Sequence, residues 1–245
     1  MSPARRSPSA EEEAPADTGA ADKPHYLGHR ERLRARLLAG GADALADYEL
    51  LEFLLFGARP RGDTKPRAKA LIARFGGFAG VFGADKEALM DVPGMGEATA
   101  AALLAVRAAA LRIARAEVQR RSVIGSWQAL LDYCTIAAGY AAIEEFRLLF
   151  LDKKNALIAD EPQHRGTVDH TPVYPREVVK RALALGASAI IMVHNHPSGD
   201  TTPSQADIEM TRAVAKALHP VGIAVHDHIV IGRGRHSSFR TLGLL

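Results

Sequence analysis

Residues 194–207 of this chain read HNHPSGDTTPSQAD, and they follow an apolar run, residues 189–193, that predicts a buried strand. Side chains two residues apart on a strand point to the same face, so His194 and His196 can converge on one ion. The prolines and glycines that follow turn the chain sharply. Ser204 then begins a helix that holds Asp207 in its first turn. The segment therefore predicts a strand, a tight loop and a helix that bring three polar side chains together.

These three side chains are suited to a metal ion. Two imidazoles and one carboxylate leave the fourth position of a tetrahedral ion open, which is the arrangement of catalytic zinc sites. Zinc lowers the pKa of a bound water to about 7. We therefore predict one Zn2+ bound by His194, His196 and Asp207. The alternative for Ser204 and Asp207 is a helix cap, in which each side chain bonds to the other residue's backbone; both interpretations can hold together.

The segment resembles the JAMM motif, and HNHPSGD is similar to the version found in the RadC family. The resemblance extends through residues 174–177 (YPRE) and 227–230 (DHIV), and covers about residues 25–245. It implies a JAMM (MPN+) domain of mixed, cytidine-deaminase-like fold that hydrolyses peptide or isopeptide bonds. It also implies that Ser204 lies beside the metal-bound water and helps to hold the oxyanion. Asn195 stands where deubiquitinase members carry Ser or Thr, which matches the RadC branch.

Amide hydrolysis also needs a carboxylate that takes a proton from water and returns it to the leaving amine. In JAMM enzymes this is a glutamate at the start of a strand far upstream, and here Glu144 and Glu145 precede the predicted strand 146–151. Side chains alternate along a strand, so Glu144 shares the apolar face that carries Phe146. Glu145 shares the other face with Arg147, and these two side chains can pair in solvent. We predict Glu144 as the general base, with Glu145 as the alternative. Both can also be a solvated helix end.

A second polar group, His226, Asp227 and His228, lies on another predicted strand. Because His226 and His228 would share a face, a second metal site is one interpretation. The other is that Asp227 or His228 contacts the ligands of the first site or its substrate.

The rest of the chain predicts an α+β protein. Its first half predicts only helices, over residues 27–38, 47–56 with Asp47 as cap, 68–75, 85–90 and 97–120. Its second half predicts helices over 132–142, 175–185 and 204–218, and strands over 146–151, 156–160, 189–193 and 223–231. We expect a disordered tail over residues 1–24, a helical helix-hairpin-helix domain over 25–118 and the zinc domain over 122–245.

The turn Pro93-Gly94-Met95-Gly96 resembles that of a helix-hairpin-helix element. Gly94 and Gly96 let backbone N–H groups approach a phosphate at the next helix, which gives DNA contact without sequence preference. Asp91 and Glu97 oppose a phosphate, and a turn used only for packing or for a protein partner is the alternative. A DNA-associated repair-type protein, with a metal domain that is structural or acts on nucleic acid, is therefore the second functional hypothesis.

Composition narrows the class of protein. The net charge of +3 permits contact with nucleic acid without arguing for it. A single cysteine, Cys134, excludes an internal disulfide framework and a Cys-rich zinc finger. The sequence has neither a long apolar run nor a signal-peptide core, so we expect a cytoplasmic protein with no membrane partner. The resemblance to JAMM enzymes implies a peptide or protein substrate.

Overall fold

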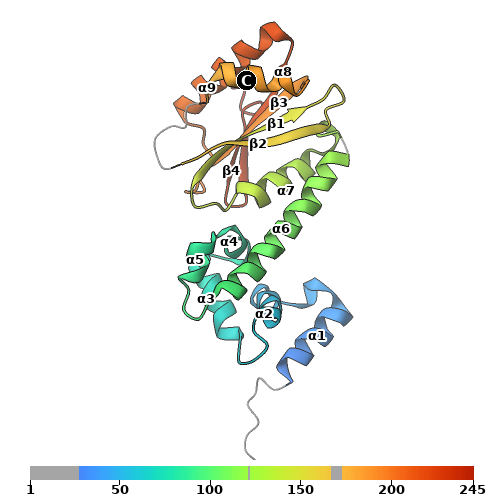
Figure 1. Cartoon of the computed structure of the whole chain (residues 1–245), viewed down its shortest axis with the longest axis vertical. Coiled ribbons are helices and arrows are strands. Elements are labelled where there is room, and N and C mark those ends of the chain that lie inside the picture. Colours follow the sequence, from blue (N-terminus) through green and yellow to red (C-terminus); the bar gives the residue numbers. More distant parts are fainter. Residues whose placement is uncertain (1–27, 121, 167–172) are drawn as a thin grey trace, which may run out of the picture.

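The computed structural model describes residues 28–120, 122–166 and 173–245, so the predicted tail lies outside the described residues. Helices make up the first part of the chain, and a five-stranded sheet flanked by helices makes up the second (Figure 1). This arrangement confirms the α+β prediction. Within the described ranges, no helix is both long and apolar enough to cross a membrane.

The helical region packs around one apolar core. Its helices are α1 (His29–Gly40), α2 (Asp47–Ala58), α3 (Lys65–Phe75), α4 (Phe78–Gly83), α5 (Lys86–Met90) and α6 (Glu97–Arg120), with a 3-10 turn at Ala42–Ala44. The prediction of Asp47 as a cap was wrong, because the helix already includes it and Ala46 is the N-cap. Glu49 supplies the cap instead, since its carboxylate accepts the N–H of Ala46 at 3.0 Å. Helix α4 was not predicted.

The sheet has the strand order β2-β1-β3-β4-β5. The strands are β1 (Glu144–Leu151), β2 (Leu157–Gly166), β3 (Ala189–Asn195), β4 (Ala224–Gly232) and β5 (Arg235–Ser238). Neighbours run antiparallel except β3 and β4, which are parallel. Strand β5 was not predicted; the Gly-Arg-Gly-Arg segment before it, with Gly234 at φ +72°, is the turn of a β4–β5 hairpin. Strand β3 continues past the apolar run, so His194 and Asn195 are part of it.

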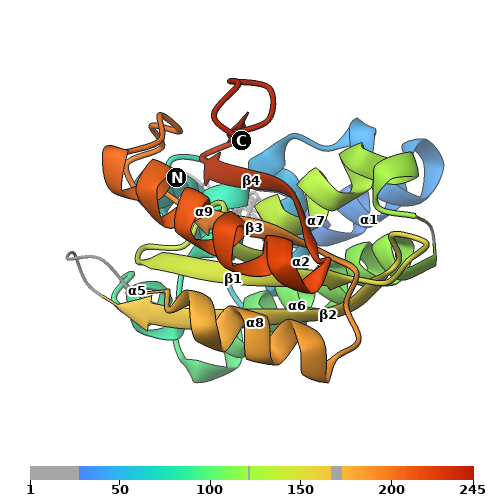
Figure 2. The ribbon, with the colours of Figure 1, turned by 90° about the horizontal axis from the view of Figure 1, so that it is seen from above.

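Helices cover both faces of the sheet (Figure 2). One face packs against α7 (Trp127–Ala138), which begins and ends earlier than predicted and follows a 3-10 turn at Ile124–Ser126; Cys134 is buried there, as expected of a core residue. The other face packs against α8 (Pro175–Ala184) and α9 (Gln205–Leu218), the latter followed by a 3-10 turn at His219–Val221. The loop that carries His196 therefore lies between β3 and α9.

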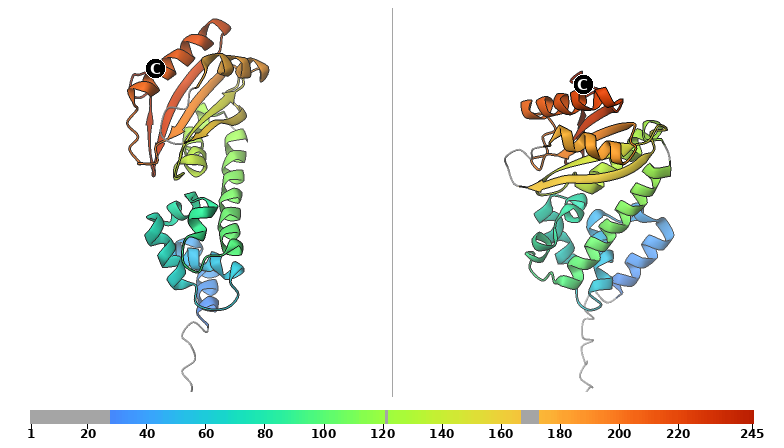
Figure 3. Two further views of the ribbon diagram at one scale, coloured as in Figure 1. Left: turned by 60° about the vertical axis from the view of Figure 1, so that its left-hand side comes forward. Right: turned by 45° about the horizontal axis from the view of Figure 1, so that its top comes forward.

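Helix α6 connects the two parts of the molecule (Figure 3). It has 24 residues and contacts α2, α4 and α5 at one end, and α7 and β2 at the other. At 1.5 Å per residue its length is about 36 Å. The turn between α5 and α6, residues 91–96, is called the hairpin below; it lies at the far end of α6 from the sheet.

Candidate metal centre

Strand β3 and helix α9 bring the predicted ligands together. His194 is the next-to-last residue of β3, and the N–H of His196 donates to the carbonyl of Ile231 at 2.9 Å, which holds the chain against β4 beyond the end of β3. Gly199, at φ +88°, then reverses the chain. This geometry is costly for residues with a Cβ and readily adopted by glycine. The loop returns to Ser204, so Asp207 faces the two histidines.

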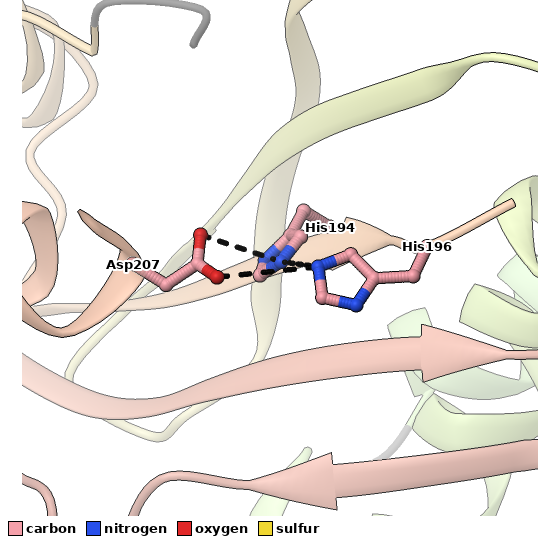
Figure 4. A group of neighbouring side chains, drawn as sticks. All are labelled: His194, His196 and Asp207. Carbon is pink, nitrogen blue, oxygen red and sulfur yellow. Dashed lines mark hydrogen bonds and ion pairs between the residues drawn. The ribbon is translucent and has the colours of Figure 1, made fainter. Parts of the chain in front are cut away.

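The three side chains converge on one point (Figure 4). The Nε2 atoms of His194 and His196 are 3.0 Å apart. Asp207 places Oδ1 3.5 Å from Nε2 of His194 and Oδ2 3.9 Å from Nε2 of His196. Within the described residues, these three form the group of His, Cys, Asp and Glu side chains that lie close enough together to hold one ion. They are called the metal group below. His194 is buried and His196 is half-buried, so the group opens to solvent on one side.

Hydrogen bonds determine which ring nitrogens carry protons. Nδ1 of His196 lies 2.6 Å from the carbonyl oxygen of Asp200, which can only accept. The N–H of His196 is therefore at Nδ1, and Nε2 has a free lone pair. On the other side, Nδ1 of His194 lies 2.8 Å from Nε2 of His228.

Burial lowers the pKa of His194 and of His228. Loss of hydration lowers the pKa of His194 to about 4, against the opposing effect of Asp207 and with a smaller contribution from the neighbouring His196. Burial also places the pKa of His228 well below its ordinary value, with His194 and His196 adding to the effect. At neutral pH the rings of His194 and His228 are therefore uncharged, and neutral imidazole is the form in which histidine binds metals.

This donor set fits a divalent metal ion. The Nε2 atoms of His194 and His196 face each other at 3.0 Å, a spacing at which both can bind one cation. A cation also neutralises the Asp207 carboxylate that faces both rings. Two histidines and one carboxylate match the ligands that zinc prefers in open sites.

Ser204 forms the helix cap that the sequence offered as an alternative for this pair. Its hydroxyl donates to Oδ2 of Asp207 at 2.6 Å, and its backbone N–H donates to the same oxygen at 2.8 Å. In return, the N–H of Asp207 donates to the Ser204 hydroxyl at 3.1 Å. The cap orients the carboxylate and leaves Oδ1 directed at His194.

Glu144 and Glu145 lie on opposite faces of β1. Phe146 pairs with His194 across the sheet, so Glu144, two residues earlier, shares the face of the metal group. Glu144 is exposed and does not join the group of three close side chains. Glu145 is only 5% exposed and lies on the α7 face.

Glu145 belongs to a buried charge network. It forms an ion pair with Arg147, as predicted, but the expectation that this pair lies in solvent was wrong. Arg147 also donates to Asp160 of β2 at 3.0 and 2.8 Å, and the hydroxyl of Tyr133 donates to the same carboxylate. The pair is buried because the β1–β2 pairing brings Asp160 beside Arg147, and Tyr133 of α7 bonds to Asp160. This pairing joins residues that are distant in the sequence.

Asn195 has a role that sequence reasoning missed. Its side chain is completely buried, accepts the backbone N–H of Glu145 at 2.9 Å and donates to the carbonyl of Ile143 at 3.1 Å. The amide therefore holds the backbone on both sides of Glu144. The available signal was an amide inside an otherwise apolar strand.

The histidines of β4 separate into different environments. His226 lies 2.6 Å from the side-chain oxygen of Asn155, away from the metal group. The sequence suggested either a second metal site or contact with a ligand of the first site. His228 makes that contact, because it bonds to His194. Asp227 is buried and accepts from Ser238 and from the backbone of Arg240.

The hairpin before α6 carries Gly94 and Gly96. Gly94 has φ +78°, and the carbonyl of Gly96 accepts the first N–H groups of α6. Arg59 donates to the carbonyl of Gly94 at 2.9 Å. The guanidinium of Arg67 packs so closely that a Cβ on Gly94 would lie 2.5 Å from it. The hairpin is thus flanked by two arginines.

Comparison with known families gives two matches. The family described as RadC-like JAB domain matches residues 124–244, which include α7, the whole sheet and the three residues of the metal group. The family described as UPF0758 N-terminal matches residues 25–101 and ends inside α6.

Proposed function

The chain belongs to the RadC family and has the fold of JAMM-type metal-dependent hydrolases, and we propose that it is a zinc-dependent hydrolase of peptide or isopeptide bonds. The observation that carries the proposal is the convergence of His194, His196 and Asp207 with two ring lone pairs directed at the same point. When bound there, zinc supplies a Lewis acid and an activated water.

The residues around the ligands have separate tasks. Glu144, exposed on the metal side of β1, takes the proton of the attacking water at its carboxylate and passes it to the leaving amine. Asn195 holds the Glu144 backbone in place through residues 143 and 145. Ser204 orients Asp207 in the resting site, and its hydroxyl must rotate away from Oδ2 to donate to the developing oxyanion.

Metal content tests the ligands. The purified chain should carry about one zinc per molecule, since three protein ligands and one open position define a single catalytic site. His196→Ala and Asp207→Ala should lose the metal, whereas His219→Ala, an exposed histidine outside the group, should keep it. A wild-type protein without stoichiometric zinc contradicts the proposal.

Hydrolysis tests the base. On a peptide or isopeptide library, Glu144→Gln should retain zinc and lose on the order of 100-fold or more in rate, which is the scale of general acid–base catalysis. Glu177→Gln, which changes another exposed glutamate, is the matched control. If Glu144→Gln remains fully active with metal bound, the base is another residue.

DNA association is a second candidate function, favoured by the two arginines beside Gly94. Glu97, which would oppose a phosphate, pairs with Lys86 at 3.2 Å, so part of its charge is balanced. We expect weak binding to duplex DNA that decreases steeply with salt. Gly94→Ala and Arg67→Gln should weaken it, and Arg212→Gln on α9 is the control. Binding that neither hairpin variant changes would contradict this function.

A further inference from the structure

A chain of buried polar side chains lies behind His194. Thr211 of α9 and His228 of β4 are both completely buried, although a threonine and a histidine carry groups that favour water. The Thr211 hydroxyl lies 2.6 Å from the backbone carbonyl of Asp207 and 2.6 Å from Nδ1 of His228. Nε2 of His228 lies 2.8 Å from Nδ1 of His194.

The backbone carbonyl of Asp207 fixes the donor and the acceptor in each of these hydrogen bonds. A carbonyl oxygen has no proton to give, so the Thr211 hydroxyl must donate to Asp207. The hydroxyl then accepts, and His228 must carry its N–H at Nδ1. Nε2 of His228 is left as an acceptor, so the proton of His194 is at Nδ1.

We propose that Thr211 and His228 are positioning residues that hold His194 in the tautomer whose Nε2 lone pair faces the metal. The proposal rests on the hydrolase function above, because it concerns a ligand of that site. The chain begins at the backbone of Asp207 and ends at the ring of His194, so it also ties two of the three ligands to each other.

Water cannot replace these groups easily. The ring of His228 stacks on Phe239, with centroids 4.4 Å apart, and meets the edge of Phe146 at 5.7 Å. In an apolar enclosure a hydrogen-bond donor without an acceptor is destabilising, because it loses its bonds to water and gains none in return. Without the Thr211 hydroxyl, His228 therefore loses its preference for Nδ1–H. An Nε2–H on His228 would oppose the Nδ1–H of His194 and force that proton to the metal-facing nitrogen.

Thr211→Val is the direct test, because valine keeps the shape of threonine without the hydroxyl. Thr211→Ser restores a hydroxyl, and Thr99→Val removes one from a buried threonine of α6. The first measurement is the long-range 1H–15N spectrum of 15N-histidine protein without metal, which reports the ring tautomers. We expect Nδ1–H for His194 in the wild type, Thr211→Ser and Thr99→Val, and Nε2–H or a mixture in Thr211→Val.

The second measurement is zinc affinity, obtained by competition with a chelator. Thr211→Val should bind zinc 10–100-fold more weakly, as for other residues that orient a ligand from behind. Thr211→Ser and Thr99→Val should stay within a few-fold of wild type. If Thr211→Val does not fold, His228→Leu and His228→Gln repeat the comparison, since glutamine keeps an acceptor for His194 and leucine removes it.

The outcomes separate this proposal from the function on which it rests. An unchanged His194 tautomer and unchanged zinc affinity in Thr211→Val overturn the positioning role. So does a weakened affinity that Thr211→Ser fails to rescue. A wild-type protein that takes up no zinc overturns the hydrolase function, whereas the spectra of the metal-free protein still decide whether Thr211 and His228 set the tautomer.

Discussion

The side-chain oxygen of Asn195 accepts a hydrogen bond from the backbone N–H of Glu145 at 2.9 Å, from the end of β3 to the start of β1. The amide nitrogen of Asn195 donates to the carbonyl of Ile143. Beyond this point β1 and β3 no longer pair through their backbones, because the pairing ends at Phe146 and His194. The amide side chain of Asn195 therefore connects β3 to β1 beyond the last backbone pair, at the position of Glu144, the proposed base.

Asn195→Ala should destabilise the protein and misplace Glu144. It leaves the buried N–H of Glu145 without its acceptor and removes the donor to the Ile143 carbonyl, so the free energy of unfolding should fall by about 1–3 kcal/mol. Urea unfolding checks the stability, and zinc content should stay near wild type because no ligand changes. Gln128→Ala, which removes an exposed amide from α7, should change stability by less than about 0.5 kcal/mol. Equal effects of the two variants would contradict the bridging role.

Neutralising the two glutamates of β1 should change the stability of the protein to different extents. Glu145→Gln removes one of the two carboxylates around the buried Arg147, so the free energy of unfolding should fall by about 1–3 kcal/mol. Asp160→Asn should cost more, about 3–5 kcal/mol, because Asp160 accepts from both Arg147 and Tyr133. Glu144→Gln should leave stability within about 1 kcal/mol. Chemical denaturation of the three variants measures this order, and a larger loss in Glu144→Gln reverses the assignment.

Metal removal should lower the melting temperature. A ligand that binds only the folded state at about 1,000 times its Kd stabilises that state by about 4 kcal/mol. Adding a chelator to the zinc-loaded wild type should therefore lower Tm by several degrees. In His196→Ala the chelator should change Tm little, since the site is already disabled. A chelator effect of the same size in both proteins would place the stabilising metal elsewhere.

Acid should weaken the start of α2. Hydrogen bonding to Arg36 lowers the pKa of Glu49, and the N–H of Ala46 adds to this effect against the opposing influence of burial. A depressed carboxyl pKa contributes stability above the unfolded-state pKa, about 4.3 for glutamate, and this contribution disappears as the pH falls through the folded value. Glu49→Gln should thus lose stability at pH 7 and differ less from wild type at pH 3. Unfolding curves at both pH values test the change.

Local patterns were sufficient to predict the metal group. His194 and His196 share a strand face, and the cap at Ser204 orients Asp207, so both relations are contained in short stretches of chain. Strand parity also placed Glu144 on the metal side. Helix α4 escaped prediction because Phe78–Gly83 has two glycines, which usually indicate a loop.

The residues that sequence reasoning missed depend on long-range pairing. The bond from His194 to His228 needs the parallel alignment of β3 with β4, and the Arg147–Asp160 pair needs the register of the β1–β2 hairpin. Asn195 becomes informative only when β1 lies beside β3. Nothing within a window around any of these residues indicates its partner.

Helix α6 spans the distance between the hairpin at its N-terminus and the domain that contains the sheet. Its first turn follows the Gly94 hairpin, and further along its length of about 36 Å it contacts α7 and β2 of the domain that holds the metal group. Under the proposed hydrolase function, a protein substrate that also bound the hairpin would have to extend along this helix before a bond of its backbone reached His194 and Asp207. Such an enzyme would select substrates by how far they extend rather than by side-chain identity, and inserting or deleting turns of α6 would change the length selected.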